Sequence, residues 1–137
     1  MNNKTKKVLI LCTGNSCRSI IAEAQINAFL EGAISDSSGV KASGKVNVNA
    51  KKLLEEKNIW KKEYHSKVID KVIDNNYDLV VTVCDHANEN CPIFPKAVKV
   101  IHIGFEDPDG KDYAAFLDTY DEIEKVLLPQ VKKELGI

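Results

Sequence analysis

The segment from Cys12 to Ser19 holds the residues best suited to chemistry in this chain: Cys-Thr-Gly-Asn-Ser-Cys-Arg-Ser. An apolar run at residues 8–11 precedes it and apolar residues at helical spacing follow it, so it is expected to join a buried strand to a helix. The backbone N–H groups of such a loop can surround an anion, and the helix N-terminus adds partial positive charge. The sequence therefore predicts a tetrahedral oxyanion site, whose expected binding residues are Thr13, Gly14, Asn15, Ser16, Cys17, Arg18 and Ser19.

Cys12 stands at the end of the expected strand, where the same field favours a thiolate. Thiolates at helix N-termini can have pKa values about one to five units below that of the free thiol. Arg18 offers a planar pair of donors for an oxyanion, and Gly14 is expected to adopt a backbone conformation that a side chain would obstruct. Ser19 is predicted to donate a hydrogen bond to the Cys12 sulfur. The alternative is that Cys12 only packs as a small apolar side chain, which is the favoured interpretation for Cys17.

Two further cysteines, Cys84 and Cys91, flank a polar segment. In a domain of this size, such cysteines are more typical of reactive thiols or metal ligands than of structural bridges. Cys84 ends an apolar run at residues 79–84, so Cys84 and Cys12 are both expected at the carboxyl ends of strands, where parallel sheets bind ligands. Residues 85–90 are expected to lack apolar anchors and to rearrange, since bridged cysteines need Cα atoms closer than about 7 Å.

The remaining pattern predicts the elements that position these residues. Apolar runs predict strands at residues 8–11 and 79–84, an alternating pattern predicts a strand at residues 97–103, and residues 33–38 are expected to form a weak strand. Helical spacing predicts a first helix that ends at Gly32 and whose apolar face holds Ile20, Ile21, Ala24, Ala28 and Phe29. Two further helices are expected to be capped by Asn49 and by Ser66. A last helix is expected from Phe116 to Leu135, and Pro129 should kink or split it. Alternating elements indicate an α/β fold, in which a four-stranded parallel sheet is flanked by helices on both faces.

The composition is that of one globular domain, residues 1–137. Hydrophobic residues make up 44% and charged residues 28%, and the net charge of -1 favours neither nucleic acid nor an anionic membrane as partner. The apolar run after the basic N-terminus is too short for a signal peptide, and no segment approaches the length that spans a bilayer. We therefore expect a cytoplasmic monomer that uses no metal or cofactor.

The loop resembles that of the low-molecular-weight tyrosine phosphatases and of the arsenate reductases related to them, which share a Cys, five residues and Arg-Ser near the N-terminus. The resemblance extends over most of the chain. Residues 81–84 (Val-Thr-Val-Cys) and 90–93 (Asn-Cys-Pro-Ile) resemble the redox segment of the thioredoxin-coupled arsenate reductases. Residues 104–108 (Gly-Phe-Glu-Asp-Pro) resemble the segment that carries the general acid. A plain phosphatase does not need the second and third cysteines, so the reductases are the better match.

The resemblance implies that arsenate is reduced to arsenite by three cysteines, with Arg18 in the catalytic set. Cys12 attacks arsenate and Asp107 protonates the departing oxygen. Cys84 then attacks the Cys12 sulfur and releases arsenite, and Cys91 attacks Cys84 to leave a disulfide that thioredoxin reduces. Two thiols supply the two electrons that As(V) needs, and a thiol of low pKa is a good leaving group. Phosphate or sulfate should bind as mimics of arsenate.

One position departs from the relatives that bind potassium beside the loop. Those proteins have an acidic residue where this chain has Lys67. Asn15, Glu23 and Ser37 are expected to form the rest of that site. We hypothesise that the Lys67 ammonium replaces the cation.

Alternative interpretations stay open at this point. A low-molecular-weight tyrosine phosphatase would use the same loop and Asp107, although the nearest aromatic residue after the acid is Tyr113. A non-enzymatic module would bind oxyanions or sense oxidation through the cysteines. A zinc site at Cys84, His86 and Cys91 lacks a fourth ligand at metal spacing. An acid ahead of a proline can also serve only to shape a turn.

Overall fold

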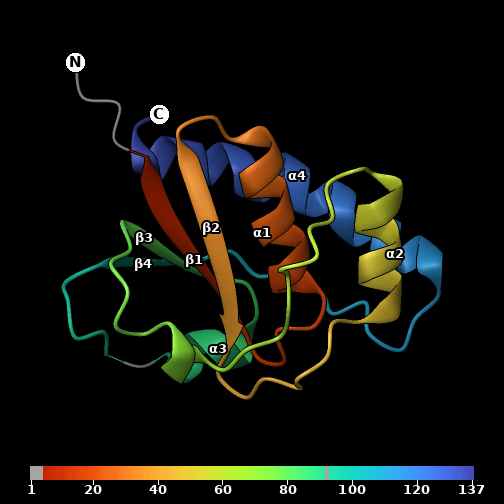
Figure 1. Ribbon diagram of the computed structural model, residues 1–137, viewed down its shortest axis with the longest axis horizontal. Helices are drawn as coiled ribbons and strands as arrows, with labels where there is room; N and C mark the ends of the chain where they lie inside the picture. Colours follow the sequence, from red (N-terminus) through yellow and green to blue (C-terminus); the bar gives the residue numbers. More distant parts are fainter. Residues whose placement is uncertain (1–4, 92) are drawn as a thin grey trace.

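A computed structural model describes residues 5–91 and 93–137. Its four parallel strands lie in the order β2-β1-β3-β4, with bounds β1 (Lys6–Cys12), β2 (Ala33–Gly39), β3 (Leu79–Thr82) and β4 (Lys99–His102) (Figure 1). The predicted four-stranded parallel sheet is confirmed. Residues 1–4 and Pro92 of the expected redox segment lie outside the described residues, as do the side chains of His86 and Asn88.

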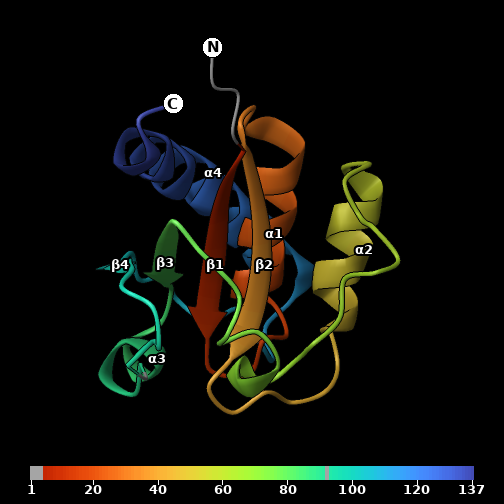
Figure 2. The same ribbon diagram turned by 60° about the vertical axis from the view of Figure 1, so that its left-hand side comes forward.

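The helices that connect the strands are α1 (Arg18–Phe29), α2 (Val48–Glu56), the 3-10 helix η1 (Ile69–Lys71), α3 (Asp85–Glu89) and α4 (Tyr113–Leu135). α1 contacts β1, β2 and α4, and α2 contacts α1 and α4, so these three helices form one layer against the sheet (Figures 1 and 2). Val8 and Ile10 of β1 and Ile20 and Ile21 of α1 are fully buried in the core between them. No helix in the described part of the chain is long and apolar enough to cross a bilayer.

Short segments cover the opposite face of the sheet. Alternate side chains of a strand point to opposite faces. Leu9 of β1 and Val80 of β3 accordingly form a second, small cluster with Val72, at the end of η1. The partly buried side chains that pack on this cluster are Tyr77, Phe94 and Val98.

The strand register brings the reactive ends of the strands to one edge of the sheet. Leu11 of β1 pairs with Thr82 of β3, and Cys12 pairs with Gly39 of β2. Both β1 and β3 have buried apolar residues in succession, as a parallel sheet requires. In Figure 2 the arrowhead of β1 points toward the end of the molecule where α3 lies.

The helix expected after Ser66 is replaced by the short η1. Lys67 and Val68 are held extended, because the Lys67 carbonyl accepts from the Gly39 N–H and Val68 forms an isolated bridge with Gly39. The Ser66 hydroxyl donates to the Gly14 carbonyl at 3.1 Å instead of capping a helix. The prediction was wrong because contacts with the end of β2 override the local helical pattern.

The ends of α1 and α2 also differ from the pattern. Ala28 and Phe29 are exposed rather than on the buried face of α1. α2 is capped by Asn47 and not by Asn49, since Asn47 Oδ1 accepts from the N–H groups of Asn49 (2.8 Å) and Ala50 (3.3 Å). The predicted cap was therefore misplaced by two positions.

α4 runs through Pro129 without the predicted split. Leu127, Leu128 and Val131 on either side of the proline are buried. Their packing holds the helix across the backbone hydrogen bond that proline cannot make. The helix ends at Gly136, whose φ of 69° is typical of a helix C-terminus.

Candidate functional site

The loop between β1 and α1 turns its carbonyl groups outward. Four backbone N–H groups of residues 40–47 donate to these carbonyls at 2.8–3.0 Å: Val40 to Cys12, Lys41 to Thr13, Ser43 to Gly14 and Asn47 to Ser16. Within residues 5–91 and 93–137, the N–H groups of Gly14, Asn15 and Ser16 donate to no protein acceptor. The loop therefore presents unpaired donors on its other side, as an anion site requires.

Asn15, rather than Gly14, adopts the left-handed conformation in this loop, with φ of 50°. Asparagine tolerates that conformation better than most residues do. A Cβ on Gly14 would meet only Ser16 Oγ, at 3.6 Å, so the expectation that a side chain would obstruct the backbone conformation of Gly14 was wrong. Sequence reasoning missed Gly39, where a Cβ would collide with the Thr13 carbonyl oxygen. The only signal was a glycine at the end of a weak strand.

Asn15 also anchors a buried polar network behind the loop. Its Nδ2 donates to Ser19 Oγ (2.8 Å) and Ser37 Oγ (2.9 Å), and its Oδ1 accepts from the Lys67 backbone N–H (2.8 Å). Ser37 in turn donates to Glu23 Oε1 at 2.6 Å. Burial raises the pKa of Glu23 to about 7, against the lowering effects of the Ser37 hydrogen bond and the Lys67 charge.

One expectation about this network is not met, and a second is not tested. Ser19 Oγ accepts from Asn15, and the hydrogen bonds of the described residues include none from Ser19 to Cys12. Lys67 lies close enough to affect Glu23, yet no ion pair within 4.0 Å joins them in that part of the chain. The replacement of a cation by Lys67 therefore stays a prediction.

Arg18 and Asp107 meet at the mouth of the loop. Arg18 Nη1 donates to the Phe105 carbonyl (3.0 Å), and Nη2 lies 3.4 Å from Asp107 Oδ2. The Phe105 N–H donates to the Val83 carbonyl (3.0 Å), which extends the β3–β4 pairing and carries Asp107 toward the loop. Among the described residues, the buried Arg18 Nε has no hydrogen-bond partner, so its N–H is left for an anion. Asp107 Oδ1 also accepts from the Asp109 N–H (2.9 Å), so this acid shapes a turn as well.

Cys12 and Cys84 lie at the carboxyl ends of the paired strands β1 and β3, and each side chain is the main influence on the pKa of the other. Interaction with Cys84 is the main cause that raises the pKa of Cys12, followed by burial, while the Arg18 charge lowers it. The same interaction is the main cause that lowers the pKa of Cys84 to about 5. Two thiols that influence each other this strongly titrate as a pair, so a single negative charge belongs to the pair and not to one sulfur. The thiolate predicted on Cys12 stays a prediction.

Two further contacts support the charge on Cys84. Thr13 Oγ1 lies 3.1 Å from its sulfur, and the Ala87 N–H donates to it at 3.4 Å. Ala87 belongs to α3 and is fully buried. Residues 85–90 therefore do have an apolar anchor, contrary to expectation, and α3 holds Cys84 in place.

The other two cysteines occupy different environments. Cys91 is half-buried against the main core, and burial raises its pKa. Cys17 is buried and its thiol donates to Asp107 Oδ1 at 3.6 Å. Burial raises the pKa of Cys17 to about 11. Cys17 is thus held as a neutral thiol packed beside the acid.

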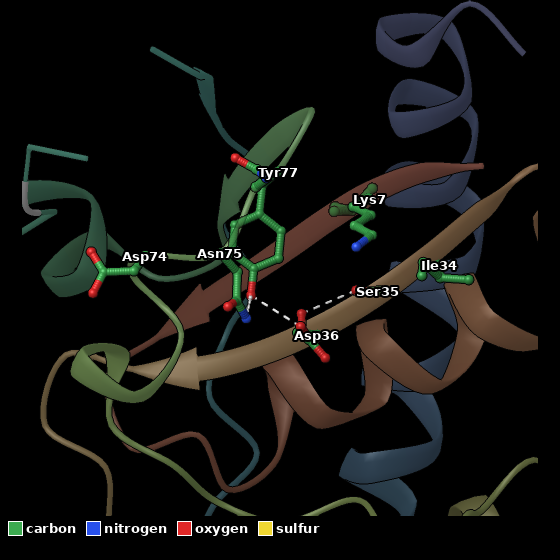
Figure 3. Close-up of a pocket in the computed structure, with 9 residues that line it drawn as sticks. Lys7, Ile34, Ser35, Asp36, Asp74, Asn75 and Tyr77 are labelled. Atoms are coloured by element: carbon green, nitrogen blue, oxygen red, sulfur yellow. Dashed lines mark hydrogen bonds between the residues drawn. The ribbon is translucent and has the colours of Figure 1, made fainter. Parts of the chain in front are cut away.

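A hollow of about 390 Å³ opens beside the sulfur pair and is lined by Arg18, Cys84, Asp85, Gly104, Phe105 and Glu106. A second hollow, also of about 390 Å³, lies toward the amino ends of β1 and β2, where Tyr77 donates to Asp36 Oδ2 at 3.0 Å (Figure 3). None of the predicted site residues lines the second hollow. In the described residues no group of three His, Cys, Asp or Glu side chains could hold a metal ion, and the His86 side chain lies outside them.

The fold and this loop define a class of protein, in which a parallel α/β domain places a cysteine at the base of an anion loop with an arginine and a carboxylate at its mouth. The sequence profile described as low molecular weight phosphotyrosine protein phosphatase matches residues 7–136. The chain belongs to this family.

Several proteins that are similar to this chain are named arsenate reductase. The chain is 48% identical over 124 residues to an arsenate reductase of Bacillus cereus (strain G9842), which covers 90% of this chain and 91% of that protein. The crystal structure of arsenate reductase from Archaeoglobus fulgidus DSM 4304 is similar with a TM-score of 0.77 and 33% identity, over 95% of this chain and 99% of that one. A structure described as an arsenate reductase in the phosphate binding state has a TM-score of 0.76 and 25% identity, over 94% of this chain and 98% of that one.

Proposed function

We propose that the chain is an arsenate reductase, in which three cysteines pass oxidation from the bound oxyanion to thioredoxin. The observation that carries the proposal is the position of Cys84 against the anion loop, where Thr13 Oγ1 lies 3.1 Å from the Cys84 sulfur. Hydrolysis of a phosphate ester needs no second thiol beside the nucleophile. The 48% identity to a protein named arsenate reductase supports arsenate as the substrate.

The first step uses the single charge of the sulfur pair. Transfer of the shared proton from Cys12 to Cys84 makes Cys12 a thiolate that faces the anion site. Its attack forms a bond from sulfur to arsenic, and one arsenate oxygen leaves as water after Asp107 donates a proton. Arg18 Nε and the N–H groups of Gly14, Asn15 and Ser16 stabilise the charge that develops on the remaining oxygens.

The second step moves the oxidation onto sulfur. Cys84 gives the proton that it took from Cys12 to solvent in the hollow that it lines, and the resulting thiolate, supported by Thr13 and Ala87, attacks the Cys12 sulfur. A disulfide bond forms, the bond from sulfur to arsenic breaks, and its electron pair reduces As(V) to As(III). Cys91 then attacks Cys84, Cys12 leaves as a thiolate, and thioredoxin supplies two electrons to the Cys84–Cys91 disulfide.

The surroundings of Asp107 favour a small inorganic oxyanion over phosphotyrosine. The Tyr113 hydroxyl donates to Glu56, and the Lys52 ammonium lies 4.6 Å from the Tyr113 ring centre. Tyr113 is thus engaged with α2 and not poised to grip an aromatic substrate. We still expect weak aryl phosphate hydrolysis, because phosphate and arsenate have nearly the same shape and charge.

A coupled assay tests this function. The protein is mixed with arsenate, thioredoxin, thioredoxin reductase and NADPH, and NADPH consumption is followed. Cys12→Ser, Cys84→Ser and Cys91→Ser should each lose multiple turnover, since each removes one carrier of the relay. Replacing thioredoxin by glutaredoxin and glutathione should slow the reaction.

Hydrolysis of p-nitrophenyl phosphate provides the comparison. Only Cys12→Ser should abolish this slow activity, because hydrolysis needs the Cys12 nucleophile but no disulfide step. Fast hydrolysis without arsenate-dependent NADPH consumption would favour the phosphatase instead. Neither activity in the reduced protein would favour a non-enzymatic oxyanion-binding or redox-sensing module.

We further propose a single-domain cytoplasmic monomer. A relay that returns to the thiol state after every turnover suits a compartment where thioredoxin keeps thiols reduced. Gel filtration and cell fractionation test these two points.

A further inference from the structure

Asp85, the first residue of α3, is joined to both β4 and β3 through His102. Its Oδ1 lies 3.0 Å from His102 Nε2, and His102 Nδ1 lies 2.8 Å from Thr82 Oγ1. The Thr82 side chain is fully buried at the end of β3, His102 is 29% exposed and Asp85 is 89% exposed. This chain of contacts leads from the interior of the sheet to the residue directly after Cys84.

Both charge states of the histidine keep this chain intact. A neutral His102 with its proton on Nε2 donates to Asp85 and accepts from the Thr82 hydroxyl. A charged His102 donates at both nitrogens. In either case Asp85 is held against β4.

Gly104 leaves the room that this contact needs. A Cβ at this position would lie 3.1 Å from His102 Nε2 and 3.7 Å from Asp85 Oδ1. Gly104 does not have a positive φ, so its backbone conformation does not require glycine. The missing side chain instead admits the hydrogen bond between His102 and Asp85, on the wall of the hollow beside Cys84.

The position of Asp85 matters because the same short helix supports the Cys84 sulfur. Ala87 lies in α3 with Asp85 and donates its N–H to Cys84. A contact that fixes the start of α3 therefore also fixes the donor on Cys84. Movement of Cys84 toward Cys91 requires α3 to give up this arrangement.

We propose that Thr82, His102 and Asp85 form a tether that holds α3 where Cys84 faces Cys12, and that this tether must release before Cys84 bonds to Cys91. The inference rests on the proposed three-cysteine relay. The three side chains are positioning residues, since they act on the sulfur through α3.

Asp85→Ala tests the tether with two measurements. In the reduced protein, otherwise unsubstituted, hydrogen exchange of the Ala87 amide should become about two- to fivefold faster, the range expected for an exposed ion pair. In Cys12→Ser protein held in a glutathione redox buffer, oxidised glutathione accepts two electrons and two protons from Cys84 and Cys91. The equilibrium constant for the Cys84–Cys91 disulfide, identified by peptide mapping, should rise by about the same two- to fivefold factor.

Three further variants provide matched comparisons. Asp85→Asn keeps an acceptor oxygen for His102 and should lie between the parent and Asp85→Ala. Gly104→Ala pushes the His102 ring away from Asp85 and should reproduce the Asp85→Ala result. Lys99→Ala breaks another exposed ion pair of β4, 2.6 Å from Glu134, and should change neither measurement.

The outcomes separate the tether from the relay. Unchanged or slower exchange at Ala87 in both Asp85→Ala and Gly104→Ala would overturn the tether. Faster exchange without a Cys84–Cys91 disulfide in any variant would support the tether and overturn the relay. Faster exchange with an unchanged disulfide equilibrium would overturn the requirement that the tether release before bonding.

Discussion

Cys12 and Cys84 illustrate how one contact changes the chemistry of two residues. For each of the two sulfurs, the other thiol has the largest effect on the pKa. Because the two thiols titrate as a pair, either sulfur can hold the negative charge that a nucleophile needs. Cys12 needs it for the oxyanion, and Cys84 needs it for the disulfide step.

Glu23, behind the anion loop, is a further ionisable residue whose pKa its surroundings shift. It is 4% exposed and accepts a hydrogen bond from Ser37, which also accepts from Asn15. Besides the Lys67 charge, nearby Lys61 lowers its pKa and Asp36 raises it, but burial dominates. The charged form of Glu23 is therefore disfavoured behind the anion loop.

Glu23→Gln should make the protein more stable at high pH. The pKa of Glu23 is raised from 4.5 to about 7 in the folded state, so its favourable contribution is complete below pH 4.5 and is lost as the pH rises through 7. Glutamine keeps the acceptor for Ser37 but never ionises. We expect its advantage in the free energy of unfolding to grow by about 2–3 kcal/mol between pH 5 and pH 8, measured by urea denaturation.

Glu55→Gln on the exposed face of α2 is the matched control, and its effect should not vary with pH in this way. A constant difference between Glu23→Gln and the parent protein across this range would contradict the burial of an ionisable Glu23.

At the scale of elements, the anion loop is shaped by a neighbour. The segment after β2 binds four loop carbonyls, and the end of β2 lies against Thr13 through Gly39. The loop is thereby held with its unpaired N–H groups toward the site before any anion binds. Such preorganisation reduces the reorganisation needed when charge develops.

Gly39→Ala should disturb this arrangement. Its Cβ would collide with the Thr13 carbonyl oxygen, so the end of β2 and the loop must separate. We expect a loss of about 1–3 kcal/mol in the free energy of unfolding, as for other overpacked sites. Phosphate binding, measured by titration calorimetry, should weaken with it.

Gly14→Ala is the comparison for stability, because a Cβ there would meet only Ser16 Oγ at 3.6 Å. Its effect on stability should stay within about 1 kcal/mol and tend to stabilise through the unfolded state. Equal losses of stability in the two variants would contradict the shaping of the loop by β2.

At the scale of the whole molecule, the sequence predicts what depends on runs and spacing. Apolar runs mark β1 and β3, an alternating pattern marks β4, and the Cys-to-Arg spacing marks the loop at the carboxyl end of β1. Parallel pairing then brings Cys12 and Cys84 to one edge, because neighbouring parallel strands end there together. These features follow from local pattern and from general rules of sheet topology.

Features that depend on specific tertiary contacts could not be predicted in this way. The extended form of residues 67–68 is imposed by Gly39, and the continuity of α4 at Pro129 by packing of its neighbours. The pKa values of Cys12 and Cys84 depend first on each other, through a contact between residues distant in the sequence. None of these contacts produces a periodic pattern of apolar residues in the sequence.

The molecule as a whole places the relay along one edge of the sheet, from the loop after β1 to α3 after β3. Trapping the relay halfway tests it most directly. Cys91→Ser protein, reduced and mixed with excess arsenate in the absence of thioredoxin, should release one arsenite per chain and accumulate a Cys12–Cys84 disulfide, identified by peptide mapping. Cys84→Ser should give neither product. Arsenite release from Cys91→Ser without that disulfide, or no arsenite at all, would contradict the relay.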